Sequence, residues 1–116
     1  MADSYRTRPV SWIKAARKEF ERFPDSAQLE LSRALTIVAE GQHPDIAKPL
    51  KGFDGVLELA LPHRGEAYRV IYALKLDTDV WIIHAFQKKS KSGIKTPKAE
   101  IDLIRERLKR LKEALR

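Results

Sequence analysis

The sequence contains no cysteine, and this absence narrows the available chemistry. Disulfide bonds, thiolate nucleophiles and cysteine-based zinc sites are excluded. No apolar run approaches the roughly 20 residues that a membrane-spanning helix needs, and segment 1–8 lacks the apolar core of a secretory signal peptide. Together these absences predict a cytoplasmic protein.

Common catalytic motifs are also missing. The glycines do not form a phosphate-binding loop, and no serine stands in the G-x-S-x-G pattern of hydrolases. The three histidines, His43, His63 and His84, lack the spacing of a metal site. We therefore expect neither a metal nor another cofactor.

Positive charge is what the sequence has in excess. Lysine and arginine number 23 against 16 acidic residues, which gives a net charge of +7 over 116 residues. A small domain this basic usually meets a polyanion such as nucleic acid, a ribosome, an acidic partner or an anionic membrane, although charge can also serve solubility alone. The length and the 43% hydrophobic content suit a single globular domain over residues 1–116.

The hydrophobic pattern predicts an α+β fold. Apolar residues at helical spacing predict three helices, over residues 14–23, 26–40 and 97–116. Alternating or β-branched segments predict four strands, over residues 8–13, 57–61, 67–76 and 80–86. Because short connections join the last three strands, they should form an antiparallel meander. We expect the N-terminal strand and this meander to form a small sheet, with two N-terminal helices and one C-terminal helix covering one face.

Basic and aromatic side chains should converge at one edge of this sheet. In an antiparallel pair joined by a tight turn, the start of one strand lies beside the end of the next, so Arg69 and His84 should be neighbours. Lys88 and Lys89 should lie just beyond them, in a basic loop over residues 88–95. Further candidates for contacts with RNA are Arg64, Tyr68, Phe86, Lys91 and Lys95.

This cluster suits metal-free cleavage of RNA. When a 2′-hydroxyl attacks the adjacent phosphodiester, the reaction needs a base for the hydroxyl proton, cations for the phosphorane and an acid for the leaving 5′-oxygen. An arginine can hold two phosphate oxygens at once, and a histidine exchanges protons near neutral pH. The predicted catalytic residues are Arg69, His84, Lys88 and Lys89.

Each of these residues also has a purely structural explanation. A lone histidine at a strand end more often holds a hydrogen bond, and Arg69 can simply pair with Glu58 or Glu66. Charge runs are usually solvated loops, and aromatic residues in strands more often belong to the core than to base-stacking platforms. Convergence on one edge, more than any single residue, favours the functional interpretation.

Three strings stand out in the second half of the chain: Tyr68–Tyr72 (YRVIY), His84–Ser90 (HAFQKKS) and Lys95–Ile101 (KTPKAEI). They resemble the RelE/ParE toxin superfamily, in particular its phage-derived, HigB-like branch. The upstream strand and helix pair also fit, so the resemblance covers nearly the whole chain. It implies the RelE-like α+β fold and the toxin half of a type II toxin–antitoxin system.

The resemblance also implies partners and an activity. Its partners would be a labile antitoxin, in this branch often a helix-turn-helix DNA-binding protein, and the ribosome with its mRNA. Many members are endoribonucleases that cleave mRNA in the ribosomal A site and so inhibit translation, whereas ParE members inhibit DNA gyrase. A third alternative is a nucleic-acid-binding co-repressor that acts only with its antitoxin.

Particular residues match the functional residues of the family. Arg69 matches an arginine that stabilises phosphate in ribosome-dependent members, and Lys88 or Lys89 matches a basic residue just after the last strand. Histidine is used in the site of HigB-like members, which favours a role for His84.

One strand departs from the RelE pattern. RelE has lysines on the strand before the tyrosine–arginine string, whereas the corresponding segment 57–61 here reads LELAL. Proton transfer would then fall to His84 with a lysine, or cleavage would be slow or absent. Glu58 would be either a base or the side chain that holds Arg69 in place.

Overall fold

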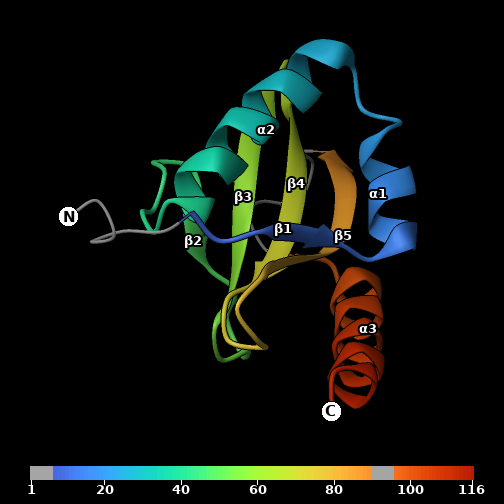
Figure 1. Cartoon of the computed structure of the whole chain (residues 1–116). Helices are drawn as coiled ribbons and strands as arrows, with labels where there is room; N and C mark the ends of the chain where they lie inside the picture. The colour runs from blue at the N-terminus through green and yellow to red at the C-terminus, as the bar shows by residue number, and fades with distance from the viewer. Residues whose placement is uncertain (1–6, 90–95) are drawn as a thin grey trace, which may run out of the picture.

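A computed structural model describes residues 7–89 and 96–116, and it confirms the expected α+β class (Figure 1). The helices are α1 (Lys14–Phe20), α2 (Asp25–Ala39) and α3 (Lys98–Ala114). The strands in the described residues are β1 (Val10–Trp12), β2 (Ala47–Pro49), β3 (Val56–His63), β4 (Glu66–Ala73) and β5 (Val80–Lys89). None of these helices is long and apolar enough to cross a bilayer.

The strands form one mixed sheet in the order β1-β5-β4-β3-β2. β3, β4 and β5 form the predicted antiparallel meander, and β1 runs parallel to β5 at one edge. β2 adds an unpredicted strand at the other edge, where Lys48 lies opposite Glu58. Three residues that end in a proline carry no period-two pattern, so this strand is specified by its pairing with β3 and not by local sequence.

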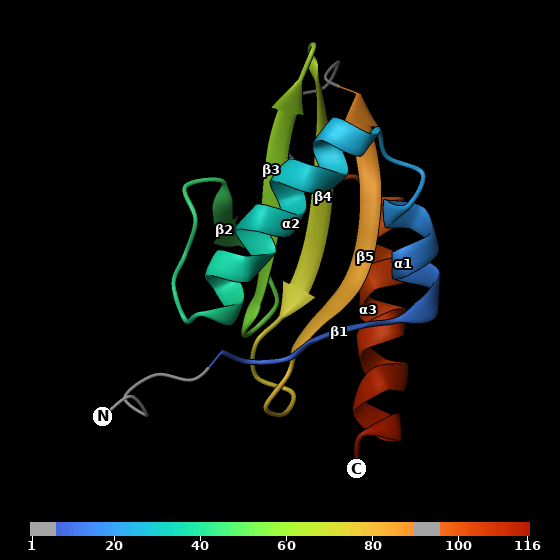
Figure 2. The ribbon, with the colours of Figure 1, turned by 45° about the horizontal axis from the view of Figure 1, so that its top comes forward.

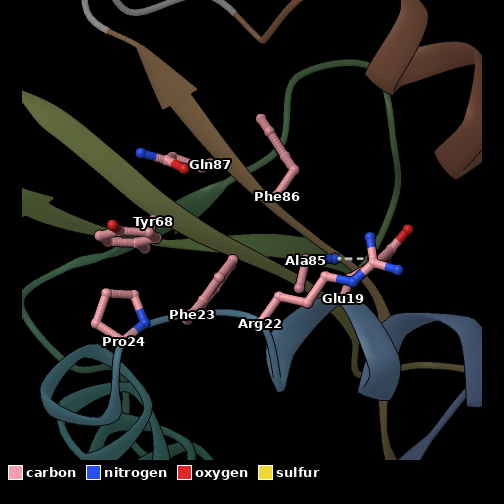
Figure 3. A pocket seen from close by; sticks show the side chains of 8 residues that line it. All are labelled: Glu19, Arg22, Phe23, Pro24, Tyr68, Ala85, Phe86 and Gln87. Carbon is pink, nitrogen blue, oxygen red and sulfur yellow. Dashed lines mark hydrogen bonds between the residues drawn. The ribbon is translucent and has the colours of Figure 1, made fainter.

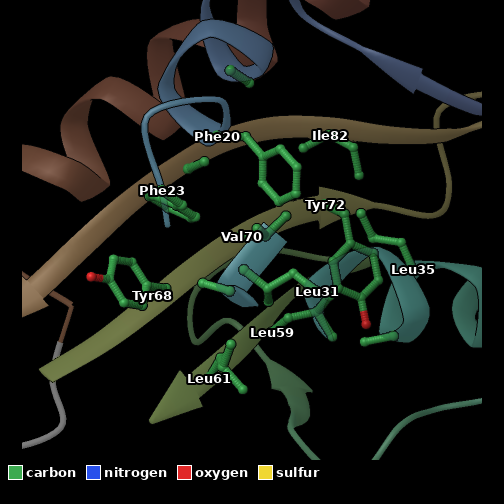
Figure 4. Packing of buried hydrophobic residues seen from close by; sticks show 14 of the residues in the cluster. Phe20, Phe23, Leu31, Leu35, Leu59, Leu61, Tyr68, Val70, Tyr72 and Ile82 are labelled. Carbon is green, nitrogen blue, oxygen red and sulfur yellow. The ribbon is translucent and has the colours of Figure 1, made fainter. Parts of the chain in front are cut away.

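The helices cover both faces of the sheet, which differs from the expected single covered face (Figure 2). α1 and α2 pack on the face that carries Val70 and Tyr72, and Figure 4 shows this larger core. α3 packs on the opposite face, where Ile104 joins Ile71 and Ile83. β4 and β5 carry apolar side chains on both faces, so both faces must be covered to remove them from water.

The meander extends further than predicted. Arg64 and Gly65 both have positive φ, at 50° and 78°, which is the backbone of a two-residue hairpin turn. This tight turn lets β4 begin at Glu66, so β5 has a partner as far as Lys89. Lys88 is therefore a strand residue opposite Ala67, which corrects the expected loop at this position.

Candidate active site

Arg69 and Glu58 form a buried ion pair between neighbouring strands. The register places Arg69 opposite Ala60 and Glu58 opposite Ile71, so the two charged side chains are diagonal neighbours on one face. Nη1 of Arg69 donates a hydrogen bond to Oε2 of Glu58. The two residues are 5% and 3% exposed. Of the two partners that the sequence offered for Arg69, Glu58 and Glu66, the structure shows Glu58.

The same guanidinium keeps a free donor. Nε of Arg69 is buried and has no hydrogen-bond partner among residues 7–89 and 96–116. A buried donor without a partner costs about 1–3 kcal/mol. A phosphate oxygen is an acceptor that would satisfy this donor, because guanidinium groups bind phosphate through parallel N–H groups.

Lys88 lies on the same face of the sheet as Arg69. It follows Phe86 by two residues on β5, and Phe86 lies opposite Arg69. Its side chain is also withdrawn from solvent, at 5% exposure. Burial lowers the pKa of Lys88, the charges of Arg69 and Lys48 lower it further, and Glu58 partly offsets them. An ammonium group in this setting gives up its proton more readily than an exposed lysine.

His84 lies near this pair but points its polar atoms elsewhere. It stands opposite Ile71, diagonal to Arg69, and its ring stacks on Phe86 with centroids 5.1 Å apart. Its Nε2 lies 2.6 Å from Oε1 of Glu100, and its Nδ1 lies 3.1 Å from Oε1 of Glu19. His84 is only 2% exposed, so protein side chains and not solvent surround its ring nitrogens.

Arg107 completes a cluster of four side chains that we term the histidine clasp: Glu19, His84, Glu100 and Arg107. Nη1 and Nη2 of Arg107 donate to the two carboxylate oxygens of Glu19 at 2.9 and 3.0 Å. Nη1 also lies 2.9 Å from Nδ1 of His84. The clasp therefore links α1, β5 and α3 through charged groups.

Glu19 is the ionised centre of the clasp. Its burial by itself raises the pKa, but hydrogen bonds from His84 and Arg107 outweigh burial and lower the pKa to about 2. A carboxylate only accepts, so Nε2–H of His84 donates to Glu100 when Glu100 is ionised. Nδ1 then either donates to Glu19 in the imidazolium form or accepts from Arg107 in the neutral form.

A pocket opens beside β5 where the edge is no longer paired with β1 (Figure 3). It has a volume of about 380 Å³ and is lined by Glu19, Arg22, Phe23, Pro24, Tyr68, Ala85, Phe86 and Gln87. The backbone N–H of Ala85 donates to Glu19 at this edge. The pocket joins the two faces, since Phe86 and Tyr68 reach it from opposite sides of the sheet.

The family of the chain follows from comparison with known proteins. Residues 18–109 match the family model described as phage-derived protein Gp49-like. The chain belongs to the Gp49-like family. No curated protein matches the sequence significantly.

Solved structures of a bacterial toxin share the fold of this Gp49-like protein. A free-state mutant of the Escherichia coli toxin RelE aligns with a TM-score of 0.63 and 19% identity, covering 91% of this chain and 99% of that one. The isolated E. coli RelE toxin aligns with a TM-score of 0.58 and 18% identity, covering 85% and 97%. The expected RelE-like α+β architecture is confirmed, and the family match agrees with the phage-derived branch that the sequence resembles.

The fold places the remaining predicted residues of this Gp49-like protein in different settings. Arg64 is exposed at the tip of the β3–β4 hairpin. Phe86 lies on the same face of the sheet as Arg69. Tyr68 lies on the opposite face and packs against Phe23, with the two ring centroids 4.8 Å apart. Lys89 is the last residue of β5, opposite Glu66. The predicted RNA contacts Lys91 and Lys95 lie outside the described residues.

Sequence reasoning missed several charged residues of this region. Lys48 reaches the face of Arg69 only because β2 pairs with β3. Glu19 of α1 and Arg107 of α3 are 88 positions apart in the chain, and no local sequence pattern predicts their contact. Glu100 had a signal, because it belongs to one of the strings that carry the family resemblance. Most of the charged residues that the sequence did not predict are therefore brought to the site by contacts between distant segments of the chain.

Proposed function

We propose that this Gp49-like protein is the toxin of a type II toxin–antitoxin system and cleaves mRNA on the ribosome. The observation that carries the proposal is the buried cluster of Arg69 and Lys88 on one face of the sheet, with Glu58 orienting the arginine. Two cations that share one buried face, one of them with an N–H group that has no partner in the described part of the chain, favour an anion as ligand. A phosphate of RNA is such an anion, and the net charge of +7 favours its approach.

Arg69 and Lys88 would divide the reaction between them. The 2′-oxygen attacks phosphorus and the bond to the 5′-oxygen breaks, which leaves a 2′,3′-cyclic phosphate and a 5′-hydroxyl. Arg69 would neutralise the phosphorane through its Nε–H group, which lacks a partner in the described part of the chain. Lys88, whose pKa is lowered by burial, would give a proton to the leaving 5′-oxygen, and His84 would take the proton of the attacking 2′-hydroxyl. Lys89 would add positive charge.

His84 can carry a proton in this reaction only if Glu100 releases its ring nitrogen Nε2. Both of its ring nitrogens face carboxylates, and Glu100 holds Nε2 at 2.6 Å. Glu100 is part of α3 and its side chain is 31% exposed. Release of Glu100 would free Nε2 of His84 for the RNA, so binding to the ribosome would have to shift the start of α3.

The proposed partners follow the family. An antitoxin of the helix-turn-helix DNA-binding class would cover the face of the sheet that carries Arg69 and Lys88 and so block the toxin. The ribosome would hold the mRNA in line for attack, which supplies the orientation that a small open site cannot supply alone. ParE-like inhibition of gyrase and co-repression with the antitoxin are the alternatives that the experiment must separate.

The test maps mRNA 5′ ends by primer extension after expression from a tightly controlled promoter. The inactive variant combines Glu58→Gln with Arg69→Gln, so that neither member of the buried ion pair is left without the other. Arg33→Gln is the matched control, because Arg33 is exposed on α2, on the other face of the sheet. We expect new cuts inside translated codons for the wild type and the control, and none for the double variant.

Other outcomes overturn the proposal in distinct ways. Growth arrest without new cuts in mRNA would support inhibition of DNA gyrase. Plasmid DNA that stays relaxed when gyrase is incubated with the wild-type protein would then confirm it. No arrest would leave the co-repressor, which an operator-binding assay with the antitoxin can test. Cuts that persist in the double variant would show a nuclease whose site lies away from Arg69.

A further inference from the structure

Lys48 lies on the same face of the sheet as Arg69 and Lys88. It stands directly opposite Glu58 in the β2–β3 pair, and opposite residues of an antiparallel pair share a face. Neighbouring strands lie about 4.8 Å apart, so β2 and β4 are separated by roughly 10 Å. Long basic side chains from these two strands can therefore reach neighbouring phosphates of one RNA strand.

The charge of Lys48 is not neutralised by its neighbours. The carboxylate opposite it, Glu58, already accepts a hydrogen bond from Arg69. Lys48 is exposed and forms no ion pair with any residue in the described ranges. Its ammonium group is thus available to an anion from solvent.

Lys48 is also close enough to the buried cluster to act on it. Its positive charge contributes to the lowered pKa of Lys88. Lys48, Arg69 and Lys88 share this face of the sheet with the carboxylate of Glu58. An added anion relieves the repulsion among these cations, and a strand of phosphates relieves it at more than one point.

We propose that Lys48 binds a phosphate that flanks the scissile phosphate of the mRNA. The inference rests on the proposed function and extends it, because it assigns a second phosphate contact to the edge strand β2. Lys48 would then set how the RNA strand crosses the sheet, running over β2 and β3 to the reacting phosphate at Arg69.

The experiment measures binding apart from cleavage. Ribosomes carry an mRNA with 2′-deoxyriboses in the A-site codon, which removes the attacking hydroxyl, and the dissociation constant is measured over a range of salt concentrations. Lys48→Gln should weaken binding about tenfold and reduce the slope of log affinity against log salt by about 0.7–0.9, the effect of one lost phosphate contact. Lys48→Arg should keep the slope, and so should Lys18→Gln, a matched exposed lysine on α1.

A second set of mRNAs locates the contact. A methylphosphonate replaces the charged phosphate on either side of the scissile position in turn. At one of these positions Lys48→Gln should cost less than about twofold, because the contact has already been removed from the RNA side. An unchanged tenfold cost at both positions, or a wild-type salt slope for Lys48→Gln, would disprove the contact.

The outcomes also separate this inference from the proposed function. A wild-type protein that cuts ribosome-bound mRNA but shows no coupling with Lys48 leaves the nuclease intact and removes only the Lys48 contact. A wild-type protein that neither binds nor cuts on programmed ribosomes overturns both.

Discussion

Arg69 of β4 donates to Glu58 of β3 across the sheet, and both side chains are almost completely removed from water. Removing one partner of such a pair leaves the other charge buried without compensation. Replacing both partners by groups that suit each other is much less costly. The pair therefore allows stability and the proposed cleavage of RNA to be tested separately.

Arg69→Ala alone should destabilise the protein by about 3–5 kcal/mol, because the carboxylate of Glu58 remains buried. Combining Glu58→Leu with Arg69→Met should return the free energy of unfolding to within about 1–2 kcal/mol of wild type. Urea denaturation measures both values, and cleavage should be absent from both variants. A double variant as unstable as Arg69→Ala would show that the pair itself holds β3 and β4 together.

Lys88→Met should lower the cleavage rate of the proposed nuclease, because it removes the proposed proton carrier. The folded state lowers the pKa of Lys88 below its usual 10.5, chiefly by burial, so the charged form costs stability at neutral pH. This cost disappears as pH rises through the lowered pKa toward 10.5. The free energy of unfolding of the wild type, relative to that of the methionine variant, should therefore increase over this pH range. The cleavage rate of the variant should be about 10²–10⁴-fold below that of the wild type. A variant that cleaves at the wild-type rate would remove Lys88 from the reaction.

His84→Gln should lower the cleavage rate by about 10²-fold if the imidazole transfers a proton. Glu100→Gln weakens the contact that holds Nε2, so it should keep or raise the rate. The comparison separates chemistry from anchoring of α3. If His84→Gln lowers only the melting temperature and cleaves normally, the residue serves the clasp alone.

Glu19 should make stability depend on pH in the acid range. Its pKa of about 2 lies below the reference value of 4.5, so its contribution is complete above about pH 4.5 and is lost as pH falls toward 2. The difference corresponds to at most about 3 kcal/mol. Urea denaturation between pH 2 and 7 should give a flatter profile for Glu19→Gln than for the wild type. Parallel profiles would show that the clasp adds no net stability.

The meander and the helices were predictable because local periodicity reports them. Leu57, Leu59 and Leu61 alternate with less apolar neighbours, as one core face of a strand requires. The ends of the elements were less predictable, since β5 continues past Phe86 only because β4 provides a partner as far as Lys89. The sequence also suggested Glu58 as a partner of Arg69, because both stand on strands expected to pair.

Composition, hydrophobic period and short strings in the sequence determined the α+β class, the basic character and the resemblance to the RelE-like toxins. Each of these properties is local or additive along the chain. Tertiary structure alone decided that Lys48 shares a face with Arg69 and that Glu19 and Arg107 enclose His84. The relative positions of these residues depend on strand register and on which face of the sheet each helix covers. Local sequence patterns determine neither of these.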